Sequence, residues 1–203
     1  MVTPAVPALA AIRFGDDDAI DTLLTRVAST VERSGRRVAG YVQIDGHRGD
    51  ACCPPIMLRS LATGEDLLLS QNLGTGSRGC RLDYGALQAA AARLQVDIGP
   101  ETALLLTNRF GKGETDGKGF RDAIGKAVDL SIPVLTAVRD NYLDGWRAFS
   151  ADLGIELPFD EDAVFAWLAA QGLVAAKVQR IGASRQSAAK IDRTATASTA
   201  AIA

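Results

Sequence analysis

The chain has 203 residues, 47% hydrophobic and 23% charged, so it can bury one sizeable core and is not disordered as a whole. Its formal net charge of -2 gives no overall positive field for a nucleic-acid backbone or an anionic membrane surface. No apolar run approaches the roughly 20 residues of a membrane span, and residues 1–11 lack the pattern of a secretory signal. We therefore expect a cytoplasmic protein with no membrane insertion and no nucleic-acid partner.

The first half of the chain alternates between strand and helix patterns. In chain order, the predicted elements are a strand at 6–14, a helix at 20–31, a strand at 37–45, and a hairpin of strands at 56–61 and 66–70. The opening strand–helix–strand unit requires a right-handed crossover and a parallel sheet.

The second half continues the alternation. It predicts, in order, a helix at 84–95, a buried strand at 102–108, a helix at 120–130, a buried strand at 133–138, and helices at 142–153 and 160–170. Such a chain folds as a three-layer α/β domain with a mainly parallel sheet. We expect one domain at 1–181. The Ala/Ser/Thr-rich tail at 182–203 has too few large apolar groups to offset its ordering entropy, so we expect it to be disordered.

The cysteines and the single histidine give no sign of a metal centre. Cys52 and Cys53 are adjacent, Cys80 is distant, and no CxxC spacing occurs. An odd cysteine count suits a reducing compartment. We predict no metal site here, and the sequence leaves the role of these cysteines open.

Three segments together resemble a bacterial domain-of-unknown-function family. They are RVAGYVQ with the following LATGE at 37–65, LLLTNRFGKGE at 104–114, and GKGFRDAI at 117–124. The family looks like a divergent branch of the P-loop NTPases, is similar to the small nucleoside-triphosphatases of thermophiles, and has members that are often associated with molybdenum transport. The similarity extends over about residues 11–157. It implies a P-loop-type fold, and molybdate, tungstate or a nucleotide with Mg²⁺ as the ligand.

The loop after the first strand departs from that family pattern. A phosphate loop needs glycines, a lysine, and a Ser or Thr hydroxyl that holds Mg²⁺. Here the place is taken by Gly15 and the carboxylates Asp16, Asp17 and Asp18. Two like charges about 4 Å apart repel by about 4 kcal/mol at a surface-like dielectric, so a triphosphate meets opposition in this degenerate loop. The aspartates are expected to cap the following helix, with a magnesium-binding role as the alternative.

The end of the strand at 102–108 departs as well. The relatives carry an acidic residue there, whereas this chain has Asn108 followed by Arg109. Asparagine cannot act as a general base, which leaves Glu114 as the one candidate. The alternative interpretation of Glu114 is a solvated loop carboxylate.

Ligands of parallel sheets bind beyond the carboxyl ends of the strands. The best anion site in the sequence is the glycine-rich stretch from Gly74 to Arg81, where glycines allow close backbone approach and arginines suit a tetrahedral oxyanion. A flexible turn is the alternative for this stretch. The predicted ligand-binding residues are Gly74, Thr75, Gly76, Ser77, Arg78, Gly79, Arg81, Asn108, Arg109 and Lys112, with Asp16, Asp17, Asp18, His47, Arg48 and Arg139 as secondary candidates.

Three hypotheses about function remain open on the sequence. The first is a non-hydrolysing binding or accessory protein for a small oxyanion or nucleotide, acting alone, as a homo-oligomer, or with molybdenum-transport or cofactor proteins. The second is a nucleotide-dependent phosphohydrolase or phosphotransferase with a rearranged magnesium site. The third is a protein-interaction module with a vestigial pocket. The absence of a lysine and a hydroxyl after the first strand favours the first over the second.

Overall fold

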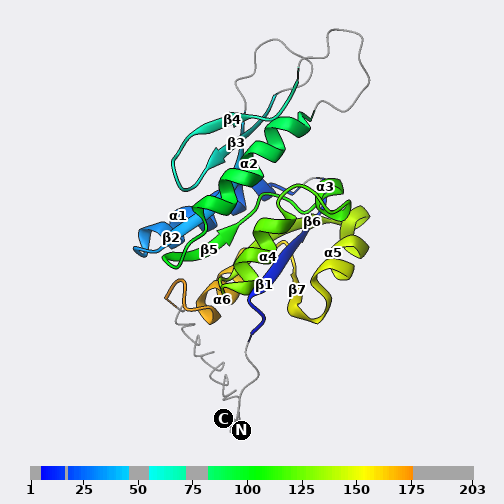
Figure 1. The fold of residues 1–203 in the computed structure, drawn as a ribbon. Helices are drawn as coiled ribbons and strands as arrows, with labels where there is room; N and C mark the ends of the chain where they lie inside the picture. Colours follow the sequence, from blue (N-terminus) through cyan, green and yellow to red (C-terminus); the bar gives the residue numbers. More distant parts are fainter. Residues whose placement is uncertain (1–5, 17, 46–54, 72–81, 176–203) are drawn as a thin grey trace, which may run out of the picture.

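The computed structural model describes residues 6–16, 18–45, 55–71 and 82–175 (Figure 1). Within these residues, seven strands form one sheet in the order β4-β3-β2-β5-β6-β1-β7. The strands are β1 (Leu9–Phe14), β2 (Arg37–Asp45), β3 (Ile56–Ser60), β4 (Asp66–Leu68), β5 (Thr102–Leu106), β6 (Val134–Arg139) and β7 (Gly154–Leu157).

The five strands β2, β5, β6, β1 and β7 are parallel, while β3 and β4 extend the sheet as an antiparallel hairpin. The parallel strands are connected by helices, as right-handed crossovers require. All the parallel strands therefore point their carboxyl ends toward the same edge of the sheet.

Helices cover both faces of the sheet (Figure 1). The α-helices are α1 (Ile20–Arg33), α2 (Tyr84–Asp97), α3 (Lys112–Thr115), α4 (Arg121–Asp129), α5 (Leu143–Ser150) and α6 (Glu161–Ala170). α1 and α6 pack on one face, with Leu24, Val27 and Leu168 fully buried there. α2, α4 and α5 pack on the other, where Trp146 is 1% exposed. The result is the predicted three-layer arrangement.

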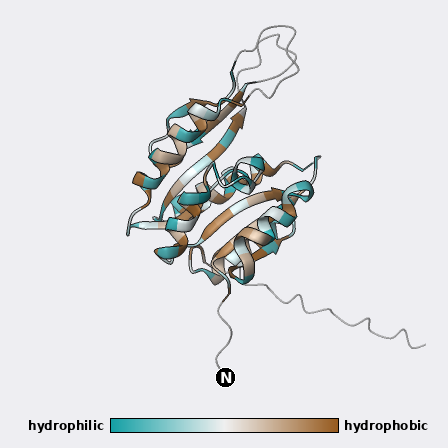
Figure 2. Cartoon of the chain, turned by 45° about the vertical axis from the view of Figure 1, so that its right-hand side comes forward, coloured by the Kyte–Doolittle hydropathy of each residue, from teal (hydrophilic) through white to brown (hydrophobic). Residues whose placement is uncertain are grey.

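The central strands are apolar on both sides because helices bury both faces. In β5, Leu104 and Leu106 join the α1 side of the core and Leu105 joins the α2 side. Figure 2 shows the same distribution, with hydrophobic strands inside and hydrophilic residues on the outer surfaces of the helices. Buried apolar surface contributes roughly 25 cal/mol per Å², so this two-sided burial is the main stabilising term of the fold.

Gly40 in β2 is required by the close approach of β5. Its φ is 132°, and a Cβ atom there would lie 1.8 Å from the carbonyl oxygen of Leu106. No L residue fits this conformation and this space together. The glycine thus sets how closely β2 packs against the central strand.

Most predicted elements are confirmed, with three corrections. The strand predicted at 6–14 begins only at Leu9, and the strand predicted at 102–108 ends at Leu106. The helix predicted at 142–153 is α5 flanked by two 3₁₀ turns. The sequence reasoning missed β7, because four residues are too few to show a periodicity. The expected tail lies outside the described residues, and the single domain at 1–181 stays a prediction.

No helix in the described part of the chain is long and apolar enough to cross a bilayer.

Candidate functional site

The carboxyl ends of the parallel strands meet the amino end of α1 at one edge of the sheet. The register pairs Phe14, the last residue of β1, with Arg139, the last residue of β6. Asn108 and Arg109 lie two and three residues after the end of β5, and α1 begins a few residues after β1. The predicted ligand-binding residues Asn108 and Arg109 and the secondary candidate Arg139 are therefore at the edge where they were expected.

Arg109 is held in a network that connects three elements. Its Nη2 donates to both carboxylate oxygens of Asp21 on α1, at 2.9 Å each, and its Nη1 donates to Oε1 of Gln43 on β2 at 2.6 Å. The backbone N–H of Gln43 donates to Oδ1 of Asn108 at 3.2 Å, and the Asn108 amide donates back to Gln43 Oε1 at 3.4 Å. Asn108 is buried, so its amide fixes β5 against β2.

Two arginine side chains, those of Arg109 and Arg139, contact the ring of Phe14. The Cζ atom of Arg109 lies 5.6 Å from the centroid of the Phe14 ring, and that of Arg139 lies 5.2 Å from it. Both distances are within the range of a cation–π contact. Arg139 also forms an ion pair with Asp16 in the loop after β1. The buried Phe14 ring thus contacts two arginines, and each of these is paired with a carboxylate from the β1–α1 segment.

The prediction that Asp16 and Asp18 cap α1 is wrong. Ala19 is the N-cap residue, and its methyl side chain makes no capping hydrogen bond. The Asp18 carboxylate instead accepts a hydrogen bond from the backbone N–H of Gly15 at 2.6 Å, which closes the loop on itself. The Asp16 carboxylate forms an ion pair with Arg139. The carboxylate in the first turn of α1 is that of Asp21. Asp17 lies outside the described residues.

Glu114 is not a solvated loop carboxylate, so that interpretation is wrong, while its role as a general base stays a prediction. Its side chain is 5% exposed. Oε2 accepts from the backbone N–H of Gly111 and Oε1 from that of Phe120, both at 3.0 Å. Gly119 permits this geometry with a φ of 62°, since a Cβ atom there would lie 2.2 Å from Oε1. The carboxylate fastens the segment between β5 and α4.

Lys112 lies apart from the arginine network. Its ammonium donates to the carboxylate of Asp116, the C-cap residue of α3, at 2.8 Å, and this hydrogen bond raises the pKa of Lys112 above its ordinary value. The side chain is 68% exposed. A surface pair of this kind contributes little to stability, so Lys112 can still turn toward a ligand.

The other predicted site residues lie outside the described part of the chain. They are Gly74, Thr75, Gly76, Ser77, Arg78, Gly79 and Arg81 of the glycine-rich stretch, together with His47 and Arg48. Cys52, Cys53 and Cys80 lie outside it too. Among the residues that are described, no group of three or more His, Cys, Asp or Glu is placed to hold a metal ion.

Sequence reasoning missed three residues of this site: Phe14, Asp21 and Gln43. Gln43 carried a usable signal, because it is a polar side chain near the carboxyl end of a predicted strand. Asp21 looked like an ordinary acidic residue in a first helical turn. Phe14 looked like part of a buried strand, which it also is, at 4% exposure.

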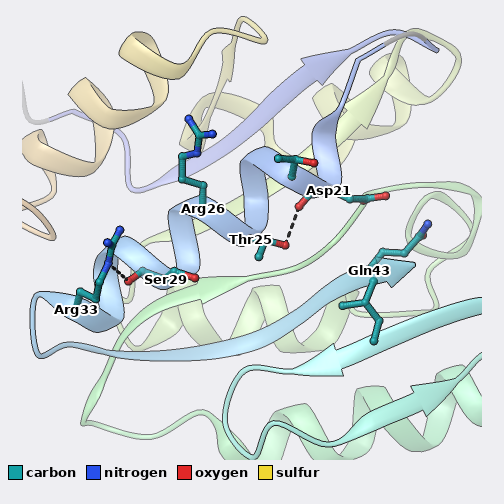
Figure 3. A pocket seen from close by; sticks show the side chains of 8 residues that line it. Asp21, Thr25, Arg26, Ser29, Arg33 and Gln43 are labelled. Atoms are coloured by element: carbon teal, nitrogen blue, oxygen red, sulfur yellow. Dashed lines mark hydrogen bonds between the residues drawn. The ribbon is translucent and has the colours of Figure 1, made fainter. Parts of the chain in front are cut away.

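A groove of about 640 Å³ runs along α1 from this edge (Figure 3). Its α1 wall carries Thr25 and Ser29, and its other wall includes Gln43 of β2. The Thr25 hydroxyl donates to the backbone oxygen of Asp21 at 2.8 Å, and Arg33 Nε donates to the backbone oxygen of Ser29 at 3.1 Å. The complete lining is Asp21, Thr22, Thr25, Arg26, Ser29, Arg33, Gln43 and Ile44.

The sheet order and the flanking helices give the chain a P-loop-NTPase-like α/β fold. THEP1 from the hyperthermophile Aquifex aeolicus has a similar solved structure, with a TM-score of 0.58 over 83% of this chain and 99% of that one. The sequences are 13% identical, so this likeness shows the fold alone.

Residues 9–167 match the family described as Protein of unknown function (DUF2478), and the chain belongs to that family. A curated relative is the Molybdenum import ATP-binding protein ModC 2 of Bradyrhizobium diazoefficiens, which is 33% identical over 159 residues. The match covers 78% of this chain and 18% of the relative, so the chain spans less than a fifth of the relative's length.

Proposed function

We propose that this protein binds a small anionic ligand, an oxyanion or a nucleotide, at the carboxyl edge of its sheet without hydrolysing it. The observation that carries the proposal is the pair of guanidinium groups on Phe14, each paired with a carboxylate of the β1–α1 segment. A guanidinium group that pairs with a carboxylate can pair in the same way with the oxygens of a phosphate or another tetrahedral oxyanion. The ligand takes the place of these carboxylates.

The two ion pairs differ in how easily an incoming anion can replace the carboxylate. Asp16 is 84% exposed, so its pair with Arg139 is a surface pair that contributes little. The pair of Arg109 with Asp21 is about two-thirds buried on both sides, with side chains 32% and 33% exposed, and Nη2 of Arg109 contacts both carboxylate oxygens. Arg139 is therefore the first contact of an incoming anion, and Arg109 follows when Asp21 releases it.

Three features support binding without hydrolysis. The loop after β1 has no lysine and no hydroxyl to hold a triphosphate and its Mg²⁺. Both oxygens of Glu114 are occupied by backbone N–H groups. Asn108, at the end of β5, is buried and has no basic group.

Two comparisons support a proposal for the ligand. The P-loop-type fold favours a nucleotide, and the relationship to a protein named for molybdenum import favours molybdate or tungstate. We propose a tetrahedral dianion or a phosphate group as the chemistry that the two have in common. Molybdenum-transport or cofactor proteins in the cytoplasm are the corresponding proposed partners.

A thermal-shift panel tests this function. It includes molybdate, tungstate, sulfate, phosphate, ATP and GTP, each with and without Mg²⁺, beside an assay for released phosphate. A ligand at a hundredfold excess over its Kd stabilises the native state by about 2.7 kcal/mol, which for this size raises the Tm by roughly 5–10 °C. We expect at least one such shift and no phosphate release from ATP or GTP. Phosphate release at several turnovers per minute contradicts the non-hydrolysing part, and a panel without any shift contradicts binding.

A further inference from the structure

The groove along α1 continues directly from the proposed anion site. Asp21 and Gln43 line its end, and both are bound to the guanidinium group of Arg109. A molecule whose anionic group replaces Asp21 at Arg109 would therefore have the rest of its structure at the mouth of this groove. The two features therefore adjoin at Asp21 and Gln43.

The groove is much larger than a bare oxyanion requires. A tetrahedral oxyanion occupies only a few times the roughly 30 Å³ of one water molecule. The groove has a volume of about 640 Å³, in the middle of the range of small-molecule sites. Asp21 and Arg33 are twelve residues apart on α1, so at about 1.5 Å per residue the groove extends roughly 18 Å.

Its lining is suited to a polar organic molecule. Within the described residues, the hydroxyl groups of Thr22 and Ser29 make no hydrogen bond, and the side-chain N–H groups of Gln43 have no acceptor. Each is a donor or acceptor available to hydroxyl or carbonyl groups of a ligand. Ile44 supplies an apolar contact.

The two arginines that line the groove differ in their partners. Arg26 is paired with Glu161 at 2.5 Å, but Arg33 binds only the backbone oxygen of Ser29 and the hydroxyl of Thr30 among the described residues. A cation without a carboxylate partner at the far end favours a ligand that carries a second polar or anionic group.

We propose that the groove along α1 binds the body of an organic anion, a phosphorylated molecule rich in hydroxyl groups, whose phosphate lies at Arg109 and Arg139. This inference rests on the proposed anion site and specifies its substrate class. A bare oxyanion then occupies only the anionic end of the site, and it binds more weakly than a molecule that also fills the groove.

A variant that fills the groove tests the inference. Ser29 is exposed on α1, so Ser29→Trp places a large ring in the groove at little cost to the fold. Gln88→Trp is the matched control, an exposed helical position on α2 at the opposite face of the sheet. The probes are inorganic phosphate, ribose 5-phosphate and AMP, measured by isothermal titration calorimetry, with circular dichroism to verify folding.

We expect ribose 5-phosphate or AMP to bind the wild-type chain at least about tenfold more tightly than phosphate. Ser29→Trp should remove that advantage and leave phosphate binding unchanged, and Gln88→Trp should change neither. The inference is overturned if neither organic probe binds more tightly than phosphate, or if Ser29→Trp leaves their affinity intact. If the wild-type chain does not bind phosphate, the result contradicts the proposed anion site and, with it, this inference.

Discussion

Replacement of Glu114 separates a structural role from a catalytic one. The buried carboxylate accepts two backbone hydrogen bonds at 3.0 Å, from Gly111 and Phe120. A hydrogen bond to a charged group contributes about 1.5–3 kcal/mol. Because these two share one carboxylate and the Gly111 end is only half-buried, we take about 3 kcal/mol for the pair. Glu114→Ala should then lower the Tm by roughly 6–12 °C in a domain of this size.

The conservative variant is expected to have half the effect. In Glu114→Gln the amide oxygen still accepts one hydrogen bond, whereas the amide nitrogen faces the other N–H group and cannot accept. Asp116→Ala is the control, a carboxylate of the same segment whose side chain is 48% exposed, and it should change the Tm by no more than about 1 °C. Thermal unfolding followed by circular dichroism measures all three. A drop of less than about 2 °C for Glu114→Ala refutes the structural role.

Three further predictions concern other parts of the chain. Alanine in place of Arg78 or Arg81 should weaken anion binding at least about tenfold in a calorimetric titration. Lysine should restore only part of the affinity, because an ammonium group cannot bind two oxygens as a planar guanidinium group does. Unchanged affinity would make the glycine-rich stretch an ordinary loop. Deletion of the chain after Gly182 should leave the Tm nearly unchanged, and a loss of more than a few degrees would show that the tail packs on the domain. Burial raises the pKa of Tyr41, so the free energy of unfolding should fall as the pH rises past about 10, where the unfolded chain releases this proton first. In Tyr41→Phe this decline, measured by urea unfolding, should be shallower. A decline equal to that of the wild type would contradict the prediction.

The fold was largely predictable because its signals are local. Buried parallel strands such as β5 and β6 show as compact apolar runs, and α1 shows the helical spacing of one buried face. The direction of the parallel strands then places residues after different strands at one edge, which is how Arg109 and Arg139 were found. β7 was not predictable, because it is an edge strand of four residues that forms only by pairing with β1.

The contacts within the site were not predictable, because they join distant parts of the chain. Arg109 and Asp21 are 88 positions apart, and nothing near either residue identifies the other as its partner. Burial of Glu114 depends on the left-handed conformation of Gly119, which brings the N–H of Phe120 to the carboxylate. The sequence shows a glycine and a glutamate but not that folded turn.

The most direct test of the central claim is the affinity for inorganic phosphate or molybdate of the wild type and of two arginine variants, measured by isothermal titration calorimetry. Arg139→Ala removes a guanidinium group from the carboxyl edge of the sheet. Arg37→Ala, the control, removes an arginine that is also exposed and also paired, with Glu101, but at the opposite edge where β2 begins. If the carboxyl edge binds the anion, Arg139→Ala lowers the affinity at least about tenfold and Arg37→Ala leaves it unchanged. Equal affinities in all three proteins, or an equal loss in both variants, contradict the claim.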